Sequence, residues 1–198
     1  MDKDWLSKSM NDKMENFVSR DSWEFLPRCM LPRDRKTLRC RWIFKAKLDG
    51  TKKTCTVVRG YEQEPGVDFV ESLFPLATNT TIKVVLSIAL KYQGRRKDWV
   101  IDVIDVEAAF LNAKVDTDVF IDMSEGLHEY QLTRGIDLGD SIIKLRRAQY
   151  GLDQSPRIWM ETFSKILESL GLQQCQTDPC LFCLFDKGGY LLAIVVVL

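Results

Sequence analysis

An aspartate followed five residues later by an aromatic residue is the most chemically suggestive feature of this sequence. Asp105 lies in residues 99–106, a run rich in β-branched side chains, and Phe110 follows where the chain turns to Glu and Ala, which favour helix. An ionised carboxylate on an apolar strand needs a partner of opposite charge. Mg²⁺ suits a carboxylate that faces a cleft, because this small cation prefers oxygen ligands. The spacing therefore predicts a metal-binding carboxylate, which is half of a phosphoryl-transfer site.

A second aspartate, Asp102, competes for this role. The two aspartates are three residues apart, and an odd separation on a strand places two side chains on opposite faces. Only one of them can face the cleft, so they are disfavoured as the acid/base pair of a hydrolase. Glu107 is expected in the first turn of the next helix, where the helix dipole favours a negative charge.

The hydrophobic periodicity predicts the elements that must position Asp105. Apolar residues at helical spacing predict helices over residues 4–18, 80–93 and 156–170, with Thr80 and Ser155 as N-caps and Gly171 ending the last one. Runs rich in β-branched and aromatic residues predict a short strand at 23–27 and hairpins at 41–58 and 180–198. Asp49-Gly50 marks the turn of the first hairpin.

Charge divides the sequence into three parts although the net charge is zero. Residues 1–60 hold 15 Lys and Arg against 8 Asp and Glu, residues 61–140 hold 7 against 15, and residues 141–198 hold 6 against 5. A basic part followed by an acidic part suits a protein that binds a polyanion with one region and metal ions with another. Two ordinary solvated faces explain the same charges equally well.

The cysteines and the apolar runs exclude other classes of site. Cys180 and Cys183 have C-x-x-C spacing, but no second pair follows, so packing is favoured over zinc. The longest apolar run, residues 190–198, is about half the length that a membrane-spanning helix requires. We therefore expect no membrane partner. The first residues lack the layout of a signal peptide, so we expect an intracellular protein, with cytoplasmic particle and nucleus both open.

A series of short segments follows in fixed order along nearly the whole chain: Trp23-Glu24, Arg41-Trp-Ile-Phe-Lys45, Asp49-Gly50, Arg59-Gly-Tyr-Glu-Gln63, Gly66-Val-Asp-Phe69, Phe74-Pro75, Asp105–Asn112, Tyr150-Gly-Leu152, Gln154-Ser-Pro-Arg157, Trp159 and Asp178-Pro-Cys-Leu-Phe182. In this order and spacing they resemble the reverse transcriptase region of copia-type LTR retrotransposon Pol polyproteins. The resemblance implies the α+β fold of a right-hand polymerase, with an antiparallel sheet backed by helices. Residues 1–95 would form the fingers and residues 96–198 a partial palm.

The resemblance also implies roles at the polymerase site. Asp105 matches the first of three palm aspartates that hold two Mg²⁺ ions, and the carbonyl of Val106 would be a further ligand. Phe110 matches the aromatic gate that packs on the sugar of the incoming deoxynucleotide and leaves no room for a 2′-hydroxyl. Tyr150 and Gly151 match a loop where glycine lets template and nucleotide approach the backbone closely.

Basic and polar positions complete the implied site. Lys53 is the candidate for a contact with the triphosphate, because a point charge suffices for a phosphate. Lys45 and Arg59 match basic positions of the fingers. Gln154 and Arg157, at the start of the helix 156–170, would either contact the nucleic-acid backbone or cap and solvate that helix. The implied partners are an RNA or DNA template with its primer, deoxynucleoside triphosphates and the remainder of a Pol polyprotein.

Departures from the family pattern bear on activity. The sequence as given ends where the family carries its paired aspartates, and Cys55, Ala113 and Asp153 stand where arginine, glycine and lysine are usual. One carboxylate of three cannot hold two cations about 3.5–4 Å apart. We therefore expect an RNA-directed DNA polymerase by resemblance, present as a fragment that is inactive alone. The alternatives are a nucleic-acid-binding remnant without chemistry, or the product of a decayed retroelement.

Overall fold

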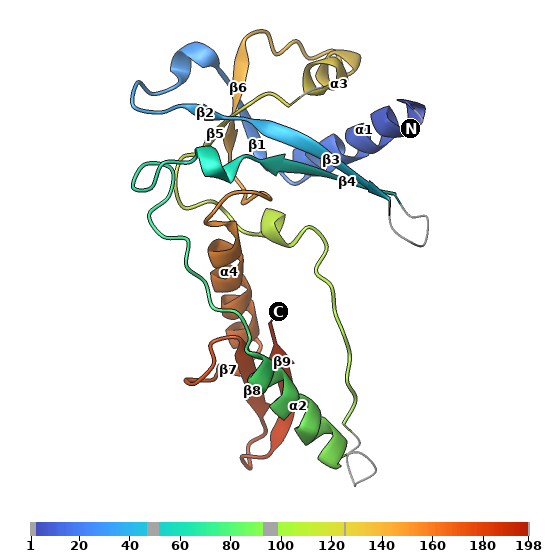
Figure 1. The fold of residues 1–198 in the computed structure, drawn as a ribbon, viewed down its shortest axis with the longest axis vertical. Coiled ribbons are helices and arrows are strands. Elements are labelled where there is room, and N and C mark those ends of the chain that lie inside the picture. The colour runs from blue at the N-terminus through green and yellow to red at the C-terminus, as the bar shows by residue number, and fades with distance from the viewer. Residues whose placement is uncertain (1–2, 47–51, 93–98, 125, 198) are drawn as a thin grey trace. The chain divides into compact units, whose positions relative to one another are not determined.

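A computed structural model describes residues 3–46, 52–92, 99–124 and 126–197 as a mixed α/β fold (Figure 1). The chain divides into two compact units, each built from two stretches of sequence. Unit 1 comprises Met1–Ser72 and Ala108–Trp159, and unit 2 comprises Leu73–Glu107 and Met160–Leu198. The functional division into fingers and palm at residue 95 stays a prediction.

Unit 1 contains a four-stranded sheet in the order β1-β6-β5-β2. Strand β6 (Ser141–Leu145) pairs antiparallel with β1 (Trp23–Pro27) and with β5 (Phe120–Asp122), whereas β5 pairs parallel with β2 (Thr37–Leu38). Unit 1 also contains two α-helices, α1 (Lys3–Ser19) and α3 (Leu127–Thr133). Three short 3-10 helices belong to it as well: η1 (Arg28–Met30), η2 (Gly60–Glu62) and η3 (Ala109–Asn112).

The core of unit 1 explains why the predicted N-terminal helix forms. Met14 and Phe17 are buried on one face of α1, and the Phe17 ring stacks on Trp23 of β1 with ring centroids 4.4 Å apart. Ile143 and Leu145 of β6 belong to the same buried cluster. Burial of such side chains contributes about 1.5–3 kcal/mol each, so packing on the sheet stabilises the helix.

The basic hairpin is present as β3 (Cys40–Ala46) and β4 (Lys52–Val58). Its register places Trp42 opposite Thr56 and Lys45 opposite Lys53. Trp42, Phe44 and Thr56 are at least partly buried on one face, whereas Arg41 and Lys45 are exposed on the other, as strand alternation requires. The predicted turn at Asp49-Gly50 lies outside the described residues.

Unit 2 combines α2 (Asn79–Tyr92), most of α4 (Ser155–Ser169) and a three-stranded antiparallel sheet. The sheet order is β7 (Gln173–Gln174), β8 (Leu181–Phe185) and β9 (Leu191–Val196), so β9 lies at an edge. Met160, Leu167, Cys180 and Phe182 form its buried core, in agreement with the packing role predicted for Cys180.

The helix caps differ from the prediction. Helix α2 is capped by Thr78 rather than Thr80, since the Thr78 hydroxyl accepts a 3.1 Å hydrogen bond from the backbone N–H of Thr81. The Ser155 hydroxyl at the start of α4 bonds the backbone of Gln149 instead, donating to its carbonyl at 2.7 Å and accepting from its N–H at 3.2 Å. It therefore ties the preceding turn to the helix.

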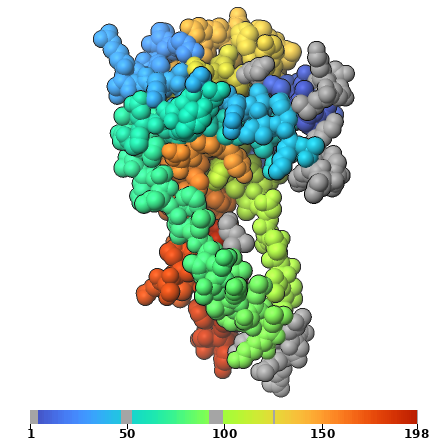
Figure 2. Space-filling model, viewed as in Figure 1, coloured from blue at the N-terminus to red at the C-terminus, as the bar shows by residue number. Residues whose placement is uncertain are grey.

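Residues 99–106 do not form the predicted strand. They are extended without a ladder partner among the described residues, and Val103 and Ile104 are 95% and 86% exposed. Figure 2 shows this yellow-green segment as a single thickness of chain. Apolar side chains favour a strand only where a neighbouring strand covers them, and the described part of unit 2 supplies none. None of the described helices is both long and apolar enough to span a bilayer.

Candidate nucleotide and nucleic-acid site

The turn at Tyr150 and Gly151 is fixed by close backbone packing in unit 1. Gly151 has a φ of +97°, which glycine adopts without strain. The carbonyl of Tyr150 accepts a 2.8 Å hydrogen bond from the N–H of Val58 at the end of β4. A Cβ added to Gly151 would lie 2.0 Å from the carbonyl oxygen of Val58. Glycine at this position is therefore required by space as well as by φ.

Phe110 lies against this turn. It is in η3, which follows Ala108 at a φ of +49°. The rings of Phe110 and Tyr150 meet edge to face, with centroids 4.6 Å apart and planes at 62°. Beneath them the N–H of Ala148 donates a 2.9 Å hydrogen bond to the carbonyl of Ala113. Ala113 and Ala148 are both fully buried, so the site has no room for a larger side chain there.

A cavity of about 20 Å³ lies beside the two rings. This is room for about one water molecule. The lining side chains come from α1, β4, η3 and the turn: Lys13, Phe17, Cys55, Thr56, Ala108, Phe110, Leu111, Gln149 and Tyr150. The hydroxyl of Thr56 and the Nε2 of Gln149 are buried there without a hydrogen-bond partner. Unpartnered buried polar atoms are rare and costly; the rest of the cavity lining is mostly apolar.

The basic residues predicted for nucleic acid fall into two groups. Lys45 and Lys53 are exposed and directly opposite each other on the hairpin, with no partner among the described residues. Arg59 lies 3.7 Å from Glu62. Arg157 is mostly buried; it donates a 2.9 Å hydrogen bond to the carbonyl of Glu71 and pairs with Asp116.

Gln154 does not lie where it could contact nucleic acid. Its side chain is fully buried, and both polar atoms have partners within unit 1. The structure therefore does not support the predicted contact with nucleic acid at this residue. From the sequence alone, a polar residue at the start of a helix does not reveal whether its side chain hydrogen-bonds within the protein or faces outward.

Asp105 and Val106 belong to unit 2. Asp105 is exposed, and Val106 is half-buried. Over residues 3–46, 52–92, 99–124 and 126–197, no three His, Cys, Asp or Glu side chains gather where they could hold a metal ion. These donors do not fit a two-metal centre. One carboxylate and one carbonyl fit a single Mg²⁺ whose remaining ligands come from water or phosphate.

Comparison with known proteins identifies the family. The sequence profile described as reverse transcriptase (RNA-dependent DNA polymerase) matches residues 22–197. The chain belongs to this family. It is 28% identical, over 99% of its length, to the retrovirus-related Pol polyprotein from transposon TNT 1-94 of Nicotiana tabacum. It is 30% identical to the Pol polyproteins from transposons RE1 and RE2 of Arabidopsis thaliana, over 98% and 99% of its length.

These relatives confirm the copia-type resemblance at the level of the family. The chain spans 14%, 13% and 13% of the length of the three relatives. No solved structure matches significantly.

Two polar side chains that line the cavity, Thr56 and Gln149, were not predicted, and neither was Gln63, which accepts a hydrogen bond from Asp153 at the end of the turn. Thr56 is on the inward face of a strand whose β-branched residues all favour strand, so its type alone gives no signal. Gln149 directly precedes Tyr150, and its position beside a matched segment was the available clue. Gln63 ends a matched segment, but glutamine is usually exposed.

Proposed function

We propose that this chain supplies the nucleotide- and template-binding part of a reverse transcriptase. In this proposal residues 1–95 act as fingers and residues 96–198 as part of the palm. The observation that carries the proposal is the edge-to-face contact of Phe110 and Tyr150 at this turn. A deoxyribose ring would pack on Phe110, whose ring would exclude a 2′-hydroxyl.

Lys45 and Lys53 are proposed to contact phosphates of the nucleic acid and of the incoming nucleotide. Like charges placed directly opposite on a hairpin repel each other. An anion between them would relieve that repulsion, which favours phosphate binding at this end of the hairpin. Arg59 is proposed as a secondary contact, because it is only partly exposed and lies close to Glu62.

Asp105 and the carbonyl of Val106 are proposed as ligands of one Mg²⁺ ion. Such an ion would neutralise phosphate charge. Among the described residues Asp105 belongs to no group of three or more His, Cys, Asp or Glu side chains that could hold a metal ion. We therefore propose that the 198 residues alone bind nucleotide and template without extending a primer.

Nucleotide binding tests the proposal directly. The fluorescence of 2-aminopurine deoxynucleoside triphosphate, added to the chain with a primer–template and Mg²⁺, should be quenched as the nucleotide binds. The ribonucleotide form should bind at least about tenfold more weakly, and Phe110→Ala should reduce this difference because the cavity opens. Equal binding of both forms by the unmodified chain would contradict the gate.

A second function, nucleic-acid binding without a nucleotide site, is favoured by one observation. The exposed face of β3 carries Arg41 and Lys45 beside Ile43. Such a mixture of basic and apolar side chains suits the binding of single-stranded nucleic acid. It predicts binding to single-stranded RNA or DNA that falls steeply with salt. Template binding without any discrimination between deoxynucleotide and ribonucleotide would support this reading over the first.

A further inference from the structure

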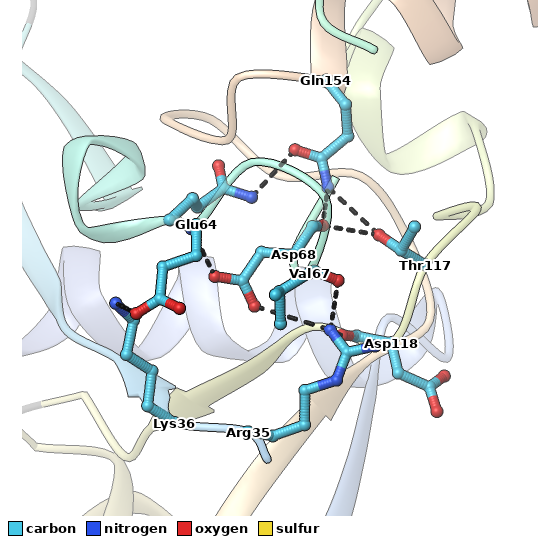
Figure 3. Close-up of polar contacts among 9 residues, drawn as sticks. Arg35, Lys36, Glu64, Val67, Asp68, Thr117, Asp118 and Gln154 are labelled. Atoms are coloured by element: carbon cyan, nitrogen blue, oxygen red, sulfur yellow. Dashed lines mark hydrogen bonds and ion pairs between the residues drawn. The ribbon is translucent and has the colours of Figure 1, made fainter. Parts of the chain in front are cut away.

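A relay of side-chain hydrogen bonds joins the loop after β4 to the start of α4. The N–H of Asp153 donates to Oε1 of Gln63 at 2.9 Å, and Nε2 of Gln63 donates to Oε1 of Gln154 at 3.0 Å. Nε2 of Gln154 then donates to the carbonyl of Asp68 at 3.1 Å. Two side chains thus connect two backbone segments that are far apart in sequence. Figure 3 shows the side chain of Gln154, the residue directly before α4, reaching toward the loop of Asp68.

The loop at the far end of the relay is itself held firmly. The carbonyl of Asp68 also accepts a 2.7 Å hydrogen bond from the hydroxyl of Thr117, and its carboxylate accepts one of 2.8 Å from the N–H of Glu64. Arg35 lies 3.7 Å from that carboxylate and donates to the carbonyl of Val67 (Figure 3). Asp68 is 2% exposed. The relay therefore ends on a fixed point.

The other end of the relay lies next to the turn that carries Tyr150. Asp153 is two residues after Gly151. Within the turn, the hydrogen bond from the N–H of Leu152 to the carbonyl of Gln149 is long, at 3.3 Å. The relay supplies a shorter, partly buried attachment at the end of this turn, at 2.9 Å.

We propose that Gln63 and Gln154 are positioning residues, which hold the turn at Tyr150 and Gly151 in register with Phe110 and so set the affinity for nucleotide. This inference rests on the proposed function of that turn. Neither glutamine touches the nucleotide; both act through the backbone of Asp153. A buried amide that loses its partner is costly, so breaking one link should loosen the turn at once.

Amide hydrogen exchange of the unliganded chain tests the positioning step without nucleotide. The reporter is the N–H of Val58, which donates to the carbonyl of Tyr150. The reference for global opening is the N–H of Leu145 in the sheet, which donates to the carbonyl of Val119 at 2.9 Å. We expect Gln154→Leu and Gln63→Leu each to accelerate exchange at Val58 about tenfold. Leu145 should change much less.

A matched control is available in the same unit. Gln131 on α3 is also buried, at 2% exposure, and takes no part in the relay. Gln131→Leu should leave the ratio of exchange at Val58 and Leu145 unchanged. The double variant Gln63→Leu/Gln154→Leu should accelerate Val58 by less than the product of the two single effects, because the bond between the two glutamines is lost in both single variants. Thr117→Val removes one bond to the carbonyl of Asp68 and a long, 3.5 Å contact with Nε2 of Gln154, but leaves the bonds of Gln63 and the Gln154–Asp68 bond in place, so it should give a smaller acceleration.

Nucleotide titration completes the test. The affinity of the chain for 2-aminopurine deoxynucleoside triphosphate should fall about tenfold in Gln154→Leu and stay unchanged in Gln131→Leu. Equal acceleration of Val58 and Leu145 in Gln154→Leu would reduce the relay to ordinary fold stability and overturn the inference. Unchanged affinity despite a loosened turn would also overturn it, while the proposed function stands. If the unmodified chain binds no nucleotide, the proposed function fails and the inferred effect on affinity fails with it.

Discussion

Gly60 and Gly151 approach so closely that a Cβ added to Gly60 would lie 1.9 Å from the carbonyl oxygen of Gly151. Gly60 begins η2 directly after β4, and Gly151 lies in the turn that carries Tyr150. Two backbone segments therefore cross with no room for a side chain. This crossing places the end of the basic hairpin against the candidate nucleotide turn.

The first prediction is that Gly60→Ala destabilises the protein by about 2–4 kcal/mol, because the backbone must move to relieve the clash. Urea denaturation measures this change. Gly60 has no positive φ, so the expected loss comes from space alone.

Gly135→Ala is the matched control for that experiment. Gly135 has a φ of +74° with nothing near the added Cβ, so its substitution reports backbone strain without a clash. We expect about 1 kcal/mol. Equal losses in both variants would contradict the crossing of Gly60 and Gly151.

The second prediction concerns the lysines that face each other on the hairpin. Lys45→Ala and Lys53→Ala should each reduce the salt dependence of single-stranded RNA binding, by about 0.7 in the slope of log affinity against log salt. Each should leave folding stability unchanged or raise it by a few tenths of a kcal/mol, because one repulsion is removed. Fluorescence anisotropy at several salt concentrations measures the slope.

Lys36→Ala serves as the control for charge alone, since Lys36 is exposed but already paired with Glu64. It should leave the slope almost unchanged. A slope that falls equally in all three variants would show that overall charge, and not the hairpin, drives binding.

Helices and strands with a clear periodic pattern of apolar residues could be predicted from the sequence. Residues 99–106 show why other elements could not. Helices α1, α2 and α4 and both hairpins lie within a few residues of their predicted positions, because each buries one periodic face. The predicted strand at 99–106 is absent, because a strand depends on a neighbour as well as on its own residues.

The candidate site shows the same division. The motif Asp105–Asn112 and the segment Tyr150-Gly-Leu152 singled out Phe110 and Tyr150 as candidate site residues, and the structure brings these two rings together. The side chains around them could not be predicted. Gln63 and Gln154 are buried polar residues whose partners come from other segments of the chain, and no local pattern reports such partners.

The third prediction is a dependence of stability on pH that comes from Asp178. The hydroxyl of Thr81, followed by the N–H of Cys180, donates a hydrogen bond to this carboxylate and lowers its pKa below the ordinary value of 3.8. These bonds join the start of α2 to the start of β8. A lowered pKa means that the carboxylate stabilises the fold above about pH 4 and loses this effect as the pH falls through its folded-state pKa.

Asp178→Asn should therefore cost about 1–2 kcal/mol at pH 7, and the difference from the unmodified chain should shrink below pH 4. Urea denaturation at both pH values measures it. Thr81→Val should reproduce part of the loss, because it removes the first donor. A difference that stays constant with pH would show that the carboxylate's charge contributes nothing.

The structure leaves residues 100–106 unpaired, and the fourth prediction is that in solution this segment adds to the sheet of unit 2 as a strand along the free edge of β9. Val103 and Ile104 are almost fully exposed, and the outer edge of β9 has no partner among the described residues. An apolar extended segment and an unpaired strand edge in one unit favour pairing. Pairing would give Asp105 the rigid support that a metal ligand needs.

Amide hydrogen exchange decides this prediction. Alternate amides of residues 100–106 should be protected, together with those of β9 that face away from β8. Val103→Pro removes a donor from the middle of the strand and should abolish the protection in both segments. Val100→Pro, at the start of the segment, should be tolerated far better. Fast exchange throughout 100–106 in the unmodified chain would leave Asp105 on an unsupported segment and remove the physical basis for assigning residues 96–198 to a palm.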